Sequence, residues 1–176
     1  MTVELISVGT ELLLGNIVNT NAAYLAEQCA RLGLSCFYQT VVGDNAGRLA
    51  QILHTALSRS DVLILSGGLG PTQDDLTKET AAGVMGMALT RDEHTAKRLQ
   101  EYFSRRKLEL TENNWKQAMV PEGAIVIDNE NGTAPGIIME KEEKRVILLP
   151  GPPGELIPMF ENAIAPYLAG AVPGVI

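Results

Sequence analysis

Soft metal-binding side chains are scarce in this sequence. It holds two histidines and two cysteines in 176 residues, too few for the usual kinds of zinc site. Cys29 and Cys36 also lack the spacing of a metal site, so we expect two small apolar residues rather than ligands or a disulfide. Any metal that this chain binds should therefore be a hard cation held by oxygen atoms.

Positive charge is also in short supply, and long apolar runs are missing. The formal net charge is -7, whereas binders of nucleic acids or anionic membrane surfaces need a basic footprint. No apolar run approaches the length of a membrane span, and residues 1–4 have no signal-peptide pattern. We therefore expect a cytoplasmic protein that binds neither nucleic acids nor membranes.

The composition is that of an ordinary globular protein, with 45% hydrophobic and 20% charged residues, and the length suits one domain. In the first half, short apolar runs alternate with segments whose apolar residues recur at helical spacing. Strands are expected at 3–8, 34–42 and 61–65, and helices at 22–32 and 45–59. This alternation predicts an α/β fold with a mainly parallel sheet and helices on both faces.

The second half predicts a change in the sheet. Residues 136–140 and 145–149 are apolar and flank a charged turn, which is typical of a β-hairpin. We therefore expect a late antiparallel hairpin, with a polar helix before it at 92–106 and a last helix after 150–154. Residues 1–170 should form the domain, and residues 171–176 should be a linker-like tail.

The most informative segment is a glycine-rich loop, SGGLGPTQDD, at residues 66–75. It follows an apolar strand and precedes an expected helix at 76–86, so its backbone N–H groups could surround a phosphate at a helix start. It lacks the Gly-Lys-Ser/Thr of a Walker A loop and the third glycine of the dinucleotide fingerprint. The alternative is a tight turn in which Thr72 and Asp75 form a helix capping box.

Acidic residues accompany this loop. Asp74 and Asp75 end it, and Asp44 follows the preceding strand at the same expected edge of the sheet, where open parallel sheets hold ligands. Acids from neighbouring strand ends can share a cation, so Asp44 and Asp75 are predicted metal ligands, with Asp74 in support. Alternatively, Asp44 is only the N-cap of the 45–59 helix.

Three further features complete the candidate site. The turn around Pro150 and Gly151 could form a wall for a base or ribose, and the loop at Asn131 and Gly132 has small residues that could admit a ligand. Each of these segments could equally be an ordinary turn. Lys78 and Lys116 are the cations nearest to the motifs in sequence and could neutralise phosphate charge, although a lone helical lysine is usually solvated.

Taken in order, these motifs resemble the N-terminal domain of the CinA competence/damage-inducible proteins, a branch of the molybdopterin-binding superfamily. The resemblance covers about residues 3–168. The matching segments are GTELLLG at 9–15, NTN at 19–21, VGD at 42–44, GGLGPT at 67–72, DDLT at 74–77, KQA at 116–118, NGTAPG at 131–136 and LPG at 149–151.

The resemblance implies a three-layer α/β/α sandwich with a nucleotide and Mg²⁺, or another divalent hard cation, at the strand ends. It implies that Asp44 and Asp75 are the functional acids, and it implies an oligomer, expected as a dimer or trimer. Lys78 and Lys116 are expected to assist because they are near the motifs in sequence. Many CinA proteins add a C-terminal amidase domain, and this chain stops before it. The expected nucleotide and phosphate contacts are Gly9, Thr10, Glu11, Ser66, Gly67, Gly68, Leu69, Gly70, Pro71, Thr72, Asn131, Gly132, Pro150 and Gly151.

The leading functional hypothesis is metal-dependent hydrolysis of a nucleoside diphosphate derivative such as ADP-ribose. The same site could instead transfer adenylate to molybdopterin, provided that it also admits a pterin. A third hypothesis is a nucleotide-binding module without turnover, in which the acids are caps and the loop only binds.

Overall fold

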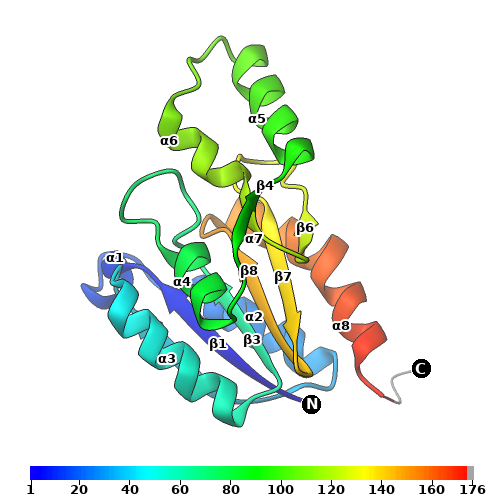
Figure 1. Cartoon of the computed structure of the whole chain (residues 1–176). Helices are drawn as coiled ribbons and strands as arrows, with labels where there is room; N and C mark the ends of the chain where they lie inside the picture. Colours follow the sequence, from blue (N-terminus) through cyan, green and yellow to red (C-terminus); the bar gives the residue numbers. More distant parts are fainter. Residues whose placement is uncertain (174–176) are drawn as a thin grey trace.

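A six-stranded sheet runs through the protein in the order β2-β1-β3-β8-β7-β6 (Figure 1). The computed structural model describes residues 1–173. Strands β2, β1, β3 and β8 are parallel neighbours, whereas β7 runs antiparallel to both β8 and β6. The strands are β1 (Thr2–Val8), β2 (Ser35–Val42), β3 (Val62–Ser66), β6 (Ile125–Ile127), β7 (Gly136–Lys141) and β8 (Lys144–Leu149). The predicted α/β fold, mainly parallel with a late antiparallel hairpin, is confirmed.

Helices cover both faces of this sheet, because each face of a buried parallel strand needs an apolar partner. On one face, α3 (Ala46–Arg59) and α4 (Thr77–Val84) contribute buried side chains such as Leu49, Leu53 and Ala81. On the other face, α2 (Thr20–Arg31) contributes Leu25 and Cys29 to a second core. Cys29 is fully buried and is a free thiol, as expected from its apolar surroundings.

The C-terminal helical segment completes the second core. It consists of α7 (Pro153–Met159), a π-helical turn (Phe160–Ile164) and α8 (Ala165–Ala171). Phe160, Ile164 and Leu168 are completely buried along its length. Helix α8 therefore continues one residue into the predicted tail of 171–176, and residues 174–176 lie outside the described residues.

Residues 89–121 form a helical projection that the sequence predicted only in part. Its base is a two-stranded antiparallel sheet of β4 (Leu89–Arg91) and β5 (Met119–Pro121), which we did not predict. Between these strands lie α5 (Glu93–Arg105), α6 (Glu112–Trp115) and a 3₁₀ turn (Lys116–Ala118). Figure 1 shows α5 and α6 standing beyond one end of the central sheet. Ala96, Leu99 and Ala118 form a small core of their own.

None of the helices in residues 1–173 is long and apolar enough to cross a membrane.

Candidate functional site

The carboxyl ends of the parallel strands border a cavity of about 700 Å³, called here the main cavity. This volume lies within the range of about 300–1,000 Å³ that is usual for ligand pockets. The chain reaches it directly after β1, β2, β3 and β8, and also at the starts of α2 and α7. The predicted residues that line it are Gly9, Glu11, Asp44, Ser66, Gly67, Gly68, Leu69, Gly70, Pro71, Thr72, Asp74, Asp75, Pro150 and Gly151.

The glycine-rich loop enters the main cavity between two backbone segments, and this passage requires glycine. Gly67 has a φ of 94°, and its N–H donates to the Leu149 carbonyl at 3.0 Å. A methyl group on Gly67 would overlap the carbonyl oxygen of Val8, and one on Gly68 would overlap the Thr77 hydroxyl. The loop is thus fixed between β1, β8 and the start of α4, with its backbone at the cavity wall.

Asp75 closes the loop on itself. Its Oδ2 accepts hydrogen bonds from the N–H of Thr72 at 3.0 Å and from the Thr72 hydroxyl at 2.6 Å. Helix α4 begins only at Thr77, and its N-cap position, Leu76, has no capping side chain. Thr72 and Asp75 therefore form a tight turn before the helix rather than the helix capping box that we considered. The carboxylate lies against Gly70, where a Cβ would come within 2.7 Å of Oδ2.

Asp44 is not a helix cap either. The N-cap of α3 is Asn45, whose side chain accepts from the N–H of Arg48 at 2.9 Å. The Asp44 carboxylate instead accepts from the Thr10 hydroxyl at 3.2 Å, and the N–H of Asp44 donates to the same hydroxyl at 3.1 Å. Thr10 does not line the main cavity itself, but it holds Asp44 at the cavity's edge.

The strand order corrects one part of the sequence argument. We expected Asp44 and the glycine-rich loop at neighbouring strand ends, but β1 lies between β2 and β3. This expectation was wrong because strands that follow one another in the chain need not be neighbours in the sheet. The end of β1 therefore places Gly9 between the two, and the Glu11 carboxylate packs against Gly9, 2.6 Å from where a Cβ would be.

The opposite wall combines the turn after β8 with the start of α2. The side-chain amide of Asn21 donates to the Gly151 carbonyl at 2.7 Å, which ties the two segments together. Asn19 caps α2 by accepting from the N–H of Ala22, and its amide donates to the Ser7 hydroxyl at 2.9 Å. The NTN motif thus builds the wall as well as starting a helix.

Several polar residues of the main cavity were not predicted as site residues, and Glu155 and Gln117 are two of them. Glu155 lines it from α7 and accepts from the Asn129 amide at 2.7 Å. Gln117 lines it from the helical projection, is only 1% exposed, and donates from Nε2 to the Leu69 carbonyl at 3.4 Å. Within residues 1–173 its Oε1 is buried without a hydrogen-bond partner. Gln117 belongs to the KQA segment at 116–118, and its place in that segment was the available signal in the sequence.

Lys78 and Lys116 do not line the main cavity. Lys78 is 6% exposed, its Nζ donates to the Lys116 carbonyl at 2.6 Å, and burial lowers its pKa to about 8. The amine of Lys116 donates to the carbonyls of Thr72, at 2.7 Å, and Asp75. It also lies 3.8 Å from the Glu79 carboxylate. Lys116 therefore joins the helical projection to the glycine-rich loop, and Lys78 joins α4 to the turn that carries Lys116.

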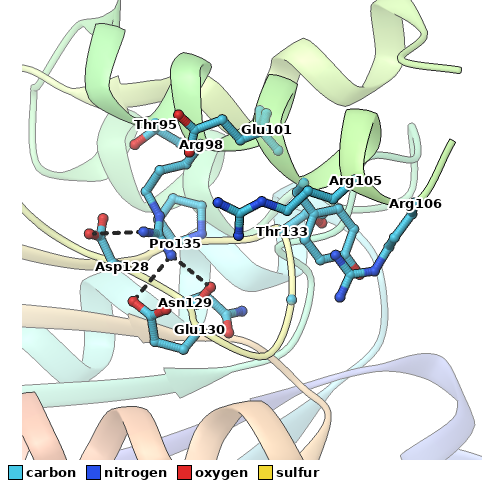
Figure 2. Close-up of a pocket in the computed structure, with 13 residues that line it drawn as sticks. Thr95, Arg98, Glu101, Arg105, Arg106, Asp128, Asn129, Glu130, Thr133 and Pro135 are labelled. Carbon is cyan, nitrogen blue, oxygen red and sulfur yellow. Dashed lines mark hydrogen bonds and ion pairs between the residues drawn. The ribbon is translucent and has the colours of Figure 1, made fainter. Parts of the chain in front are cut away.

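Asn131 and Gly132 also lie away from the main cavity. The amide of Asn131 donates to the Gly154 carbonyl at 3.1 Å, which fixes this loop to the start of α7. Gly132 lines a smaller second cavity of about 210 Å³ (Figure 2). Thr133 lines both cavities, so the loop is the partition between them.

The acidic residues do not form a ready-made metal cage. Within residues 1–173, no three side chains of the His, Cys, Asp or Glu kind are grouped closely enough to hold a metal, so Asp44, Asp74 and Asp75 are not preassembled. However, Mg²⁺ usually takes one or two protein carboxylates and completes its shell with water and substrate phosphates. Asp44 and Asp75 suit that pattern, because Oδ1 of each accepts no hydrogen bond from the described residues.

The chain resembles known proteins over nearly its whole length. The family described as "Probable molybdopterin binding domain" matches residues 4–170. The CinA-like protein of Dictyoglomus turgidum is 55% identical over 176 residues, which are 100% of this chain and 43% of that protein. Other curated relatives are of similar size, so the chain spans about two fifths of the length of the relatives it matches.

Solved structures agree with the sequence comparisons. The protein CinA with unknown function from Thermoplasma acidophilum has a TM-score of 0.88 and 34% identity, over 96% of this chain and 99% of that one. The molybdopterin biosynthesis enzyme MoaB from Thermus thermophilus has a TM-score of 0.62 at 15% identity, over 96% of each chain, which shows the shared fold alone. This chain therefore belongs to the molybdopterin-binding-domain family and, within it, to the CinA group.

Proposed function

We propose that this domain is a metal-dependent nucleotide pyrophosphatase that acts on nucleoside diphosphate derivatives such as ADP-ribose. The proposal is supported above all by one arrangement in the main cavity. A glycine-rich backbone segment faces the same space as the carboxylates of Glu11, Asp44 and Asp75. Such a backbone suits phosphate oxygens, and such acids suit the cation that accompanies a pyrophosphate.

In this reaction the chain's own groups bind and orient the pyrophosphate. The backbone N–H groups of residues 68–70 would bind its oxygens and stabilise the charge that develops during cleavage, because the N–H of Gly67 is already bonded to the Leu149 carbonyl. Asp44 and Asp75 would hold a divalent cation between the protein and the phosphates. When bound, such a cation polarises the phosphate and lowers the pKa of a coordinated water.

The nucleoside would be recognised by the polar residues at the cavity's sides. Glu155 accepts from Asn129 with one carboxylate oxygen and can accept from a ribose hydroxyl with the other. Gln117 is too deeply buried for its Oε1 to touch a ligand, and its amide instead donates to the Leu69 carbonyl of the loop. The Glu155 acceptor favours a ligand with sugar or amino donors over inorganic pyrophosphate.

The lysines would act by positioning. Lys116 binds the carbonyl groups of Thr72 and Asp75, so it fixes the turn that carries the Asp75 carboxylate. We therefore propose that Lys116 maintains the conformation of the glycine-rich loop and does not contact phosphate. Lys78 supports Lys116 by donating to its carbonyl.

The test is an assay of purified protein with ADP-ribose and each of Mg²⁺, Mn²⁺ and Co²⁺, with AMP release followed by chromatography. We expect hydrolysis with at least one metal, and a loss of about 100-fold or more in kcat for Asp75→Asn with binding largely kept. Glu109→Gln is the matched control, because Glu109 is exposed and lines neither cavity. Absence of AMP with every metal, with intact substrate recovered, would refute the proposal.

Adenylyl transfer to molybdopterin is the second candidate, because the family description and the shared fold with MoaB favour a pterin ligand. The two reactions differ in the acceptor of the adenylate, which is water in one and the pterin phosphate in the other. Restored molybdoenzyme activity in a strain lacking the adenylyltransferase would favour transfer. Tight binding of ADP-ribose without either reaction would instead favour a binding module.

A further inference from the structure

The second cavity, called here the small cavity, lies between helix α5 and the loop of residues 128–135 (Figure 2). Its volume of about 210 Å³ is below the range of about 300–1,000 Å³ usual for independent ligand pockets. It shares Thr133 with the main cavity, and its residue Asn129 donates to Glu155 of the main cavity. Its size and shared wall suit one end of a ligand whose remainder lies in the main cavity.

The acidic residues of the loop are already paired. Arg98 lies 3.6 Å from Asp128 and 3.2 Å from Glu130, and His94 lies 3.0 Å from Asp128. Figure 2 shows the Arg98 guanidinium directed at this loop, with Glu101 pointing back toward Thr95 and Arg98. Arg98 is therefore engaged with both acids of the loop, and His94 adds positive charge there only when it is protonated. Glu101 is a third acid of the lining.

Two guanidinium groups remain. Arg105 and Arg106 line the small cavity and form no ion pair within residues 1–173. Arg106 stacks on the Tyr102 ring at 3.6 Å from its centroid, which fixes its plane, and both arginines line the small cavity together with Thr133 (Figure 2). Guanidinium groups bind phosphate by paired hydrogen bonds, and a threonine hydroxyl can add another.

The loop of residues 128–135, which forms one wall of the small cavity, is held in place by its own hydrogen bonds. The Asn129 side chain donates to the Ala134 carbonyl at 2.9 Å and accepts from the N–H of Asn131 at 3.0 Å. Because these bonds fix the backbone on both sides of Thr133, a ligand would find its hydroxyl in place without a loss of loop entropy.

We propose that the small cavity is a subsite for a phosphate monoester carried by the substrate outside its pyrophosphate, bound by Arg105, Arg106 and Thr133. The inference rests on the proposed function for the reaction and adds a substrate class, namely phosphorylated ADP-ribose derivatives. Either ribose of ADP-ribose can carry such a phosphate, so a phosphate on each ribose is tested.

The experiment compares ADP-ribose with ADP-ribose 2′-phosphate and with ADP-ribose 1″-phosphate, by calorimetry and by KM. We expect at least one phosphorylated ligand to bind about tenfold more tightly than ADP-ribose, as expected for a charge-assisted contact. Arg105→Gln and Arg106→Gln should each remove most of this preference and leave ADP-ribose binding unchanged. Lys97→Gln is the control, because this exposed cation of α5 lines neither cavity.

The outcomes separate the two proposals. Equal affinity for all three ligands, or a preference that survives both arginine substitutions, would refute the subsite. An arginine-dependent preference in binding, together with no hydrolysis of any ligand, would support the subsite and refute the pyrophosphatase reaction. Both variants change exposed residues at a helix end, and unchanged thermal unfolding would verify that they fold.

Discussion

Gly67→Ala tests whether the passage of the glycine-rich loop past strand β1 is as tight as the structure shows. Two costs combine at this position. The left-handed φ of 94° disfavours any residue with a Cβ, and the new methyl group would overlap the Val8 carbonyl oxygen. The carbonyl belongs to the backbone of a central strand, so it cannot move aside as a flexible side chain could.

The expected magnitude follows from these two terms. Left-handed backbone costs about 1–2 kcal/mol for a residue with a Cβ, and overpacking against a fixed group costs about 1–3 kcal/mol. A gain of about 0.5 kcal/mol from the lower entropy of the unfolded chain offsets part of this. The net loss is about 1.5–4.5 kcal/mol in the free energy of unfolding, or roughly 10 °C in Tm for a chain of this length.

Gly15→Ala is the matched control. Gly15 also has a left-handed φ, of 72°, but nothing lies within 4 Å of the position of its Cβ. It should therefore lose only the backbone term, about 1 kcal/mol and a few degrees in Tm. Urea and thermal unfolding of both variants give the comparison. Equal losses at the two positions would show that the contact with Val8 contributes nothing, and the reasoning about the loop would fail.

Three further predictions concern the loop. The pKa of Lys78 is about 8 in the folded protein, whereas it is about 10.5 in the unfolded chain. As the pH falls, the unfolded chain therefore binds this proton first. The stability that the neutral Lys78 amine provides above about pH 10.5 is lost progressively, and the loss is complete once the pH has fallen through 8. Lys78→Met should therefore abolish a stability gain of about 3 kcal/mol between pH 7 and 10.5, measured against wild type by urea unfolding. Gly70→Ala should displace the Asp75 carboxylate and lower kcat roughly 100-fold with little change in Tm; an unchanged kcat would argue against that geometry. Lys116→Met should speed amide hydrogen exchange at residues 72–75, and unaltered exchange would remove its positioning role.

Local pattern predicted most of the central fold, because buried strands and amphipathic helices differ in period. Helix 22–32 and the 136–149 hairpin are examples, and Glu142 and Glu143 adopt the left-handed backbone of a tight turn. Strands β4 and β5 were missed because each has only three residues and neither alternates. Their pairing joins segments about 30 residues apart, which periodicity within a short window does not reveal.

The candidate site was predictable where its residues belong to the loops after the parallel strands. Asp44 and Asp75 are such residues, and both line the main cavity. Lys78 and Lys116 were chosen for their closeness in sequence, but the direction of a side chain depends on tertiary packing. Gln117 and Glu155 became visible only once the helical projection and α7 were placed around the same space.

The base of the helical projection has a consequence for how this fold can diversify. The chain leaves and returns through the paired strands β4 and β5, and the N–H of Glu122 donates to the Ala88 carbonyl at 2.8 Å just outside them. Because exit and return are adjacent, residues between them can be inserted, deleted or exchanged without altering the order of the six central strands. The projection supplies Gln117 to one cavity and α5 to the other, so its replacement would change ligand preference while the loops after β1 and β2 stayed intact. The loop after β3 would lose the support of Lys116.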